Sequence, residues 1–116
     1  MTTTAPKPPP GLGTSGRRLW RSVVDSYTMA EHELTLLREA CRTADAVDLL
    51  QAQLDRDGVM SESSQGVRVH PALAELRQQR ITLARLLAAL QVPAEQGDQS
   101  RPVRAPRGVY GLRSAQ

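Results

Sequence analysis

The sequence predicts an all-α fold, in which a short N-terminal helix precedes a long antiparallel helical hairpin. Three observations predict it. The apolar content is mostly Leu, Ala and Val, with one Trp, two Tyr and no Phe, which suits helix-on-helix packing better than a β-sandwich. Apolar residues recur at three- and four-residue spacing over two long stretches. Capping residues, a glycine and prolines stand where these stretches begin or end.

Three parts of the chain differ in composition. Residues 1–14 are rich in Thr, Pro and Gly, which predicts a flexible arm. Residues 15–92 predict the helical domain, and residues 93–116 are polar and dotted with arginines, which predicts a disordered basic tail. A domain of this size buries only a modest core. We therefore expect it to form a homo-oligomer or to need another partner.

The first helix is expected over residues 16–26, with Ser15 as its N-cap. Trp20 lies at the edge of the apolar face, where we expect it to anchor the core. A platform for base stacking is the alternative role for this indole. The apolar face itself consists of Leu19, Val23 and Val24.

The second helix is expected to be long. Thr28-Met29-Ala30-Glu31 has the pattern of a capping box and predicts its start, and Gly58 predicts its end after about Arg56. The apolar stripe drifts around the helix axis, so we expect contacts with more than one neighbouring helix. Cys41 lies on this stripe and is interpreted as a small core residue.

The turn and the third helix follow. The turn is compatible with two short strands, 59–60 and 67–69, joined by a polar Ser/Gly segment, or with a plain loop. Pro71 is well placed as the first residue of the third helix. This helix is expected to run to about Gln91 and to be ended by Pro93.

Two charged residues fall within apolar stripes of the hairpin. In an antiparallel hairpin that turns at 57–70, residues whose numbers sum to about 127 lie opposite each other, which places Asp48 beside Arg80. A lone buried charge is costly, so we predict a partly buried ion pair between them. The alternative is that both side chains reach solvent, since a long Arg stem does so easily.

Several motifs resemble catalytic or cofactor sites without meeting their requirements. The run from Gly11 to Gly16 spells G-x-G-x-x-G, but Pro8-Pro9-Pro10 precedes it where a dinucleotide site needs a buried strand. A flexible joint and helix start is the plainer interpretation. A milder alternative is that free amides at this helix start, beside Arg17 and Arg18, hold a backbone phosphate of DNA.

Metal and acid–base sites are not predicted either. His32-Glu33 begins like a zinc-protease motif, but Leu36 occupies the second ligand position. His70 is expected to be a surface histidine or one with satisfied hydrogen bonds. The carboxylates of the long helix alternate with arginines at helical spacing, as on a solvated face. We predict no catalytic residue, no metal and no cofactor.

Basic residues near the N-terminus are the candidate DNA contacts. Residues 1–18 contain no acid, and the next acid is Asp25. Arms and helix starts of this kind contact phosphates in many DNA-binding proteins. A solvated basic surface is the plainer alternative. The candidates are Lys7, Arg17, Arg18 and Arg21.

Charge and hydropathy bear on partner and location. Residues 19–57 carry four arginines and eight acids, which favours an alternative function as a helical adaptor that binds protein rather than DNA. No segment approaches the ~20 apolar residues of a membrane span, and no signal peptide is expected. The single cysteine excludes an internal disulfide framework and fits a reducing compartment. We expect a cytoplasmic protein.

The order of these features resembles the small terminase subunit family of tailed phages and prophages. The resemblance runs from Gly11 to Pro93 and depends on the order of its motifs. These are Gly-Arg-Arg-Leu-Trp-Arg-Ser-Val-Val (16–24), Met-Ala-Glu-His-Glu-Leu (29–34), Leu-Arg-Glu-Ala-Cys-Arg-Thr-Ala-Asp (37–45), Gly58, Gly66, His-Pro-Ala-Leu (70–73), Arg80 and Leu-Leu-Ala-Ala-Leu-Gln-Val-Pro (86–93).

The resemblance implies a non-catalytic role in packaging viral DNA. Small terminase subunits assemble into rings, bind double-stranded DNA at the packaging site and present it to the large terminase subunit. The large subunit carries the ATPase and the nuclease. The resemblance therefore implies double-stranded DNA, the large subunit and further copies of the chain as partners, in the cytoplasm of a bacterial host.

Overall fold

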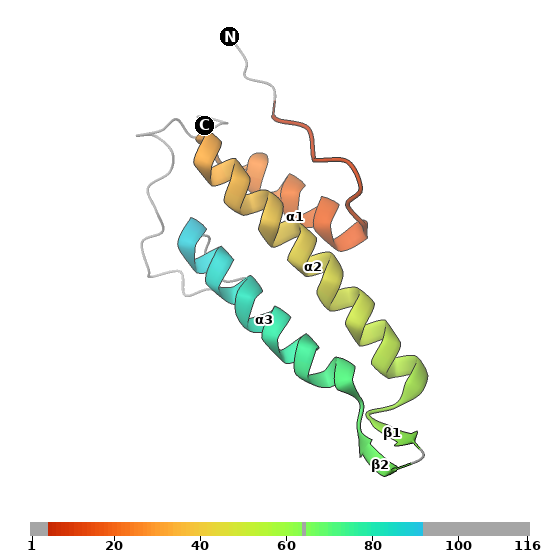
Figure 1. The fold of residues 1–116 in the computed structure, drawn as a ribbon. Helices are drawn as coiled ribbons and strands as arrows, with labels where there is room; N and C mark the ends of the chain where they lie inside the picture. The colour runs from red at the N-terminus through yellow and green to blue at the C-terminus, as the bar shows by residue number, and fades with distance from the viewer. Residues whose placement is uncertain (1–4, 64, 92–116) are drawn as a thin grey trace.

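A computed structural model describes residues 5–63 and 65–91 of the chain, which form three helices and a small β-hairpin at the turn between the second and third helices (Figure 1). The elements follow one another as α1 (Thr14–Val24), α2 (Glu31–Asp57), β1 (Met60–Ser63), β2 (Gly66–Val69) and α3 (Pro71–Leu90). The predicted all-α fold is confirmed, and of the two alternatives for the turn the structure has the pair of short strands. The predicted tail, 93–116, lies outside the described residues.

The helices form a hairpin with a third helix on one half of it. α2 and α3 run antiparallel along their length, and α1 packs against the first half of α2 (Figure 1). α2 contacts both neighbours, as the drifting stripe predicted: Leu37 and Cys41 meet α1, whereas Leu50 and Leu54 meet α3. α2 is therefore the central element of the fold.

The segment 5–13 is packed against the domain, which corrects the prediction of a flexible arm over 1–14. Leu12 is buried, Ala5 packs against the same core, and the indole Nε1 of Trp20 donates to the Pro6 carbonyl at 2.9 Å. Composition alone missed this because the segment contributes only one large apolar side chain, and its fixed position depends on Trp20. Residues 1–4 lie outside the described residues.

The start of α2 differs from the predicted capping box. The helix begins at Glu31, and the buried Glu33 accepts a hydrogen bond from the Ala30 amide at 2.8 Å. The N-cap is Ala30, so the predicted cap at Thr28 was two residues too early. The predicted end is confirmed, since Gly58 has a φ of 85° and its amide donates to the Leu54 carbonyl at 2.7 Å. That left-handed backbone favours glycine.

The far end of the hairpin consists of β1, β2 and the start of α3. The strands pair with Met60 opposite Val69 and Ser63 opposite Gly66. Pro71 is the first residue of α3, as predicted. His70 caps this helix, because its Nδ1 accepts from the Ala72 amide at 3.0 Å while its Nε2 lies 3.0 Å from the Asp57 carboxylate.

The core has two unequal parts. We call the larger one the head core; it consists of Leu12, Trp20, Val23, Val24, Leu37, Cys41 and Leu90. We call the smaller one the tip core; it consists of Leu54, Ala72 and Leu76 and lies nearer the β-hairpin. The buried Leu90 comes from the end of α3, so α3 connects the two parts.

The predicted ion pair between Asp48 and Arg80 was wrong. Both residues are exposed, and each has another partner: Ser15 donates to Asp48, and Arg80 donates to the Gln51 side chain at 2.8 Å. The predicted register holds near the turn, where Asp57 meets His70. Farther along, α1 lies beside Asp48 and engages it, which the register of the hairpin alone did not take into account.

Candidate nucleic-acid interface

The start of α1 is held by a carboxylate from α2. The Asp45 side chain accepts hydrogen bonds from the amides of Gly13 and Gly16, both at 2.7 Å. No side chain of α1 caps this end, so the predicted cap by Ser15 was wrong. A carboxylate is favourable here because the amides at a helix N-terminus carry partial positive charge.

Glycine at position 16 allows α1 and α2 to approach closely. A Cβ atom placed there would lie 2.4 Å from Asp45 Oδ2 and 2.9 Å from the Cys41 carbonyl oxygen. Gly11 has a φ of +89°, a backbone that L side chains rarely adopt. The G-x-G-x-x-G run is therefore a turn and a helix-packing motif, as the plainer interpretation predicted, although the joint is fixed rather than flexible.

The same contacts weigh against the alternative of a phosphate site at the start of α1. The amides of Gly13 and Gly16 already donate to Asp45. The Arg17 side chain folds back to donate to the Leu12 carbonyl. A phosphate would have to displace a carboxylate that makes two hydrogen bonds, so this end of the helix serves packing.

The four candidate cations are all exposed but not equivalent. The Arg17 side chain is committed to the Leu12 carbonyl, whereas the side chains of Arg18 and Arg21 have no hydrogen bond or ion pair with another described residue. Being three apart, they share one face of α1. Because Gly16 and Trp20 face the core, this face points away from α2. Lys7 lies on the segment that packs beside α1.

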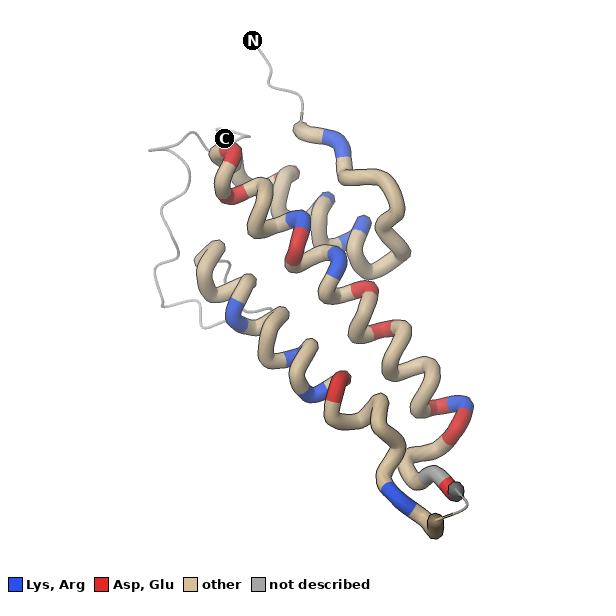
Figure 2. Tube along the Cα trace, in the orientation of Figure 1, with Lys and Arg blue, Asp and Glu red and all other residues tan. Residues whose placement is uncertain are grey.

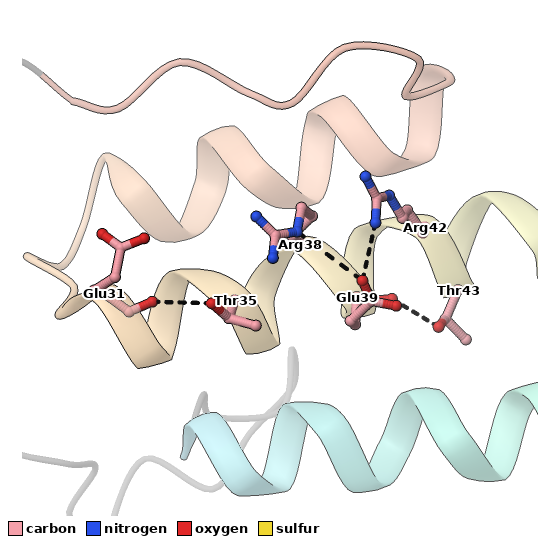
Figure 3. A network of polar contacts seen from close by, with 6 residues as sticks. All are labelled: Glu31, Thr35, Arg38, Glu39, Arg42 and Thr43. Carbon is pink, nitrogen blue, oxygen red and sulfur yellow. Dashed lines mark hydrogen bonds and ion pairs between the residues drawn. The ribbon is translucent and has the colours of Figure 1, made fainter.

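Two further arginines belong to the same end of the molecule. Arg38 and Arg42 lie 4.0 Å and 3.0 Å from the Glu39 carboxylate, and both extend to the α1 side of α2, away from α3 (Figure 3). The alternation of acids and arginines along α2 predicted a solvated face for both. Their four-residue spacing was a signal that they share one side of the helix. One carboxylate between two guanidinium groups leaves excess positive charge.

Many acids of α2 are already engaged within the fold. Glu33 accepts from Ala30, Asp45 from two amides of α1, and Asp57 lies against His70. Blue positions of α1, of the neighbouring segment and of the first half of α2 gather at one end of the molecule (Figure 2). At this end Glu33 and Asp45 are therefore occupied by backbone amides and are not available as acceptors for a partner.

Cys41 is a core residue, as predicted. Its side chain is fully buried, and burial raises the pKa of the thiol to about 12, with the Asp45 carboxylate adding to the shift. A thiol in this state is a poor nucleophile, because the reactive form is the thiolate. Within 5–63 and 65–91 there is also no group of three or more His, Cys, Asp or Glu side chains placed to hold a metal ion.

Comparisons leave the chain without a recognised relative. No family model matches it, and neither a curated protein nor a solved structure does. Among the described helices, none combines the length and the apolar character needed to cross a membrane. The arginine-bearing end formed by α1 and the first half of α2 is thus the candidate site, on the basis of its geometry and charge.

Proposed function

We propose that this protein is a small terminase subunit of a tailed phage or prophage. In this role it binds double-stranded DNA and hands it to a large terminase subunit, which supplies the ATPase and the nuclease. The chain acts as a homo-oligomer, with a ring as the expected form, in the cytoplasm of the bacterial host. It carries no catalytic site and needs no cofactor.

The observation that carries the proposal is the exposed arginine face of α1. Arg18 and Arg21 are available for phosphates because neither is bound to another described residue. The helix that bears them is fixed to α2 by Asp45 and by the close approach at Gly16. A rigid helix that presents free guanidinium groups loses little conformational entropy on binding a DNA backbone.

The sequence resemblance supports the same function from another direction. Its motifs coincide with structural features of the fold: Gly16 at the α1–α2 contact, Cys41 in the head core, and His70-Pro71 at the start of α3. These coincidences explain why such residues occur in this order. They concern the fold, so the DNA-binding part of the proposal depends on the arginine face.

A helical adaptor that binds protein and no DNA is the second candidate. The exposed apolar side chains at the β-hairpin favour it, since Met60, Val67 and Val69 are all more than half exposed. Contiguous exposed apolar surface is typical of protein interfaces. The two functions differ in one respect that is easy to measure, which is binding to duplex DNA at low salt.

The test is fluorescence anisotropy with labelled duplex DNA over a range of salt concentrations. Each phosphate contact contributes about 0.9 to the slope of log K against log salt. We expect Arg18→Gln/Arg21→Gln to lower the magnitude of that slope by about 2. Circular dichroism should show an unchanged helix content, because both side chains are exposed.

The matched control is Arg56→Gln. Arg56 is exposed on the last turn of α2, far from α1, and lies near Asp57. Its loss should leave the salt slope unchanged. If wild-type protein fails to bind duplex DNA at low salt, the adaptor function is favoured. If Arg56→Gln lowers the salt slope as much as the double variant does, the α1 face is not the site.

A further inference from the structure

The half of the molecule that contains the β-hairpin exposes a set of large apolar side chains. All of them lie between positions 49 and 81, and none belongs to α1 or to the first half of α2. The most exposed is Leu49, at 71%. These exposed side chains are Leu49, Val59, Met60, Val67, Val69 and Ile81.

Leu49 and Ile81 lie on opposite outer edges of the hairpin at nearly the same height. Leu49 is five residues from Leu54 on α2, and Ile81 is five residues from Leu76 on α3. Five residues turn a side chain about 140° around the helix axis, so both side chains point away from the α2–α3 contact. Arg80 donates to Gln51 across the hairpin. Leu49 is two residues from Gln51, and Ile81 is one residue from Arg80, in both cases on the side away from the β-hairpin. Their positions along the hairpin axis therefore differ by less than about one helical turn.

The two arms of this half carry opposite charge. Residues 48–63 hold four carboxylates and one arginine, a net charge of −3, whereas residues 66–85 hold four arginines and one carboxylate, a net charge of +3. Figure 2 shows the blue positions along α3 and β2. None of those four arginines forms an ion pair with a carboxylate among the residues that the structure describes. They are Arg68, Arg77, Arg80 and Arg85.

The two outer edges of the β-hairpin also differ from each other, because one belongs to β1 and the other to β2. β1 follows α2 and β2 leads into α3, and within 5–63 and 65–91 the two strands pair with each other and with no further strand. Each strand therefore has one outer edge with no strand beside it, and such an edge favours pairing with another strand. If a second copy lies beside the first in the same orientation, its β1 runs antiparallel to β2 of the first.

We infer that this half of the molecule binds a second copy of the same chain, side by side and in the same orientation. The α3–β2 edge of one copy lies against the α2–β1 edge of the next. Ile81 then meets Leu49 of the neighbour, the basic arm meets the acidic arm, and β2 meets the next β1. The two edges differ, so the contact is heterologous and repeats from copy to copy.

This inference deepens the homo-oligomer part of the proposed function and rests on it. A contact between two different edges leaves one of each free in a dimer, so it closes only by forming a ring. It also leaves the arginine face of α1 outside the contact, because α1 lies at the other end of the molecule from the β-hairpin (Figure 1). DNA binding and assembly can therefore be measured separately.

The test uses cysteines at the two positions and a short bis-maleimide crosslinker. Both positions are exposed, so Leu49→Cys and Ile81→Cys should fold, whereas the buried Cys41 stays unmodified. The double variant L49C/I81C should give a ladder of covalent multimers. Each single variant alone should give no crosslink, and a mixture of the two single variants should give covalent dimers.

Each other outcome would overturn the inference. Dimers from L49C alone or from I81C alone would indicate a symmetric contact between like edges. No crosslinks from a protein that light scattering shows to be multimeric would place the contact elsewhere, and the proposed function would stand. A wild-type protein that is monomeric at all concentrations would reject both the contact and the oligomeric part of the proposed function, whatever its affinity for DNA.

Discussion

The two halves of the molecule differ in how completely they bury their apolar residues. The head half contains α1, segment 5–13 and the first half of α2, and its core holds seven buried residues with no large apolar side chain exposed. The tip half contains the β-hairpin and the rest of the helical hairpin. Its core holds three buried residues, while six large apolar side chains are exposed.

The difference follows from the number of helices that cover α2. The part of α2 up to Asp48 is covered by α1 on one side and by α3 on another, whereas the part beyond Asp48 meets α3 alone among the described helices. Two helices leave much of each other's surface in water, and a two-stranded hairpin adds little core. The head half thus resembles a complete small domain, and the tip half resembles one side of an interface.

The largest effect is expected from removing the central side chain of the head core. Trp20→Ala deletes a buried indole and its hydrogen bond to Pro6, so the free energy of unfolding should fall by about 3–5 kcal/mol. Urea denaturation followed by circular dichroism measures it. Leu49→Ala on the tip half is the control and should stay within about 0.5 kcal/mol in dilute solution. Equal losses for both would contradict the distinction between the halves.

A smaller loss is expected where the head half is fixed between helices. Asp45→Ala removes the acceptor of two amides at the start of α1, which should cost about 1–2 kcal/mol. Asp55→Ala is the matched control, because that exposed carboxylate accepts only from Gln51. Gly16→Ala should cost less stability in the Asp45→Ala variant than in the wild-type protein. A Cβ atom at position 16 would clash with Asp45 and with the Cys41 carbonyl, and the first of these clashes is then absent. Strictly additive losses would argue against the close approach.

The corresponding cap in the tip half should matter less. His70→Ala removes the acceptor for the Ala72 amide and the contact with Asp57, and we expect a loss of about 1 kcal/mol. His32→Ala, at an exposed position, should leave stability unchanged. Thermal unfolding of both variants would show this. A loss from His70→Ala that exceeds that from Asp45→Ala would reverse the ranking of the two halves.

Cys41 provides a chemical test of how tightly the head core is closed. The folded pKa of the thiol is raised from 9.0 to about 12 by burial and by Asp45. The thiol contribution to stability is thus complete below about pH 9 and is lost as pH rises towards 12. At pH 8 a thiol reagent should modify the protein only after unfolding. Rapid modification of the folded protein would show that the head core opens readily.

Local patterns in the sequence predicted the elements well. Gly58 and Pro71 marked the ends of helices correctly because each acts through its own backbone conformation. Cys41 and Trp20 were placed in the core because helical periodicity is a local property. The β-hairpin was left open between strands and a loop, since strands this short carry little hydrophobic signal.

Contacts between distant residues were not predictable in the same way. Asp45 caps a helix that begins 31 residues earlier in the chain, and no local pattern connects the two. Once α1 is placed beside α2, Asp48 turns to Ser15 instead of Arg80. The candidate DNA contacts were identified by residue type, but only the fold separates the engaged Arg17 from the free Arg18 and Arg21.

Hydrogen exchange at several protein concentrations, followed by mass spectrometry, tests the contrast between the halves most directly. We predict that peptides from α1 and the first half of α2 exchange slowly at every concentration. Peptides from β1, β2 and the middle of α3 should exchange quickly in dilute solution and become protected as the concentration rises. Protection of the tip half that is strong in dilute solution and independent of concentration would contradict the account, because this half would then need no second copy.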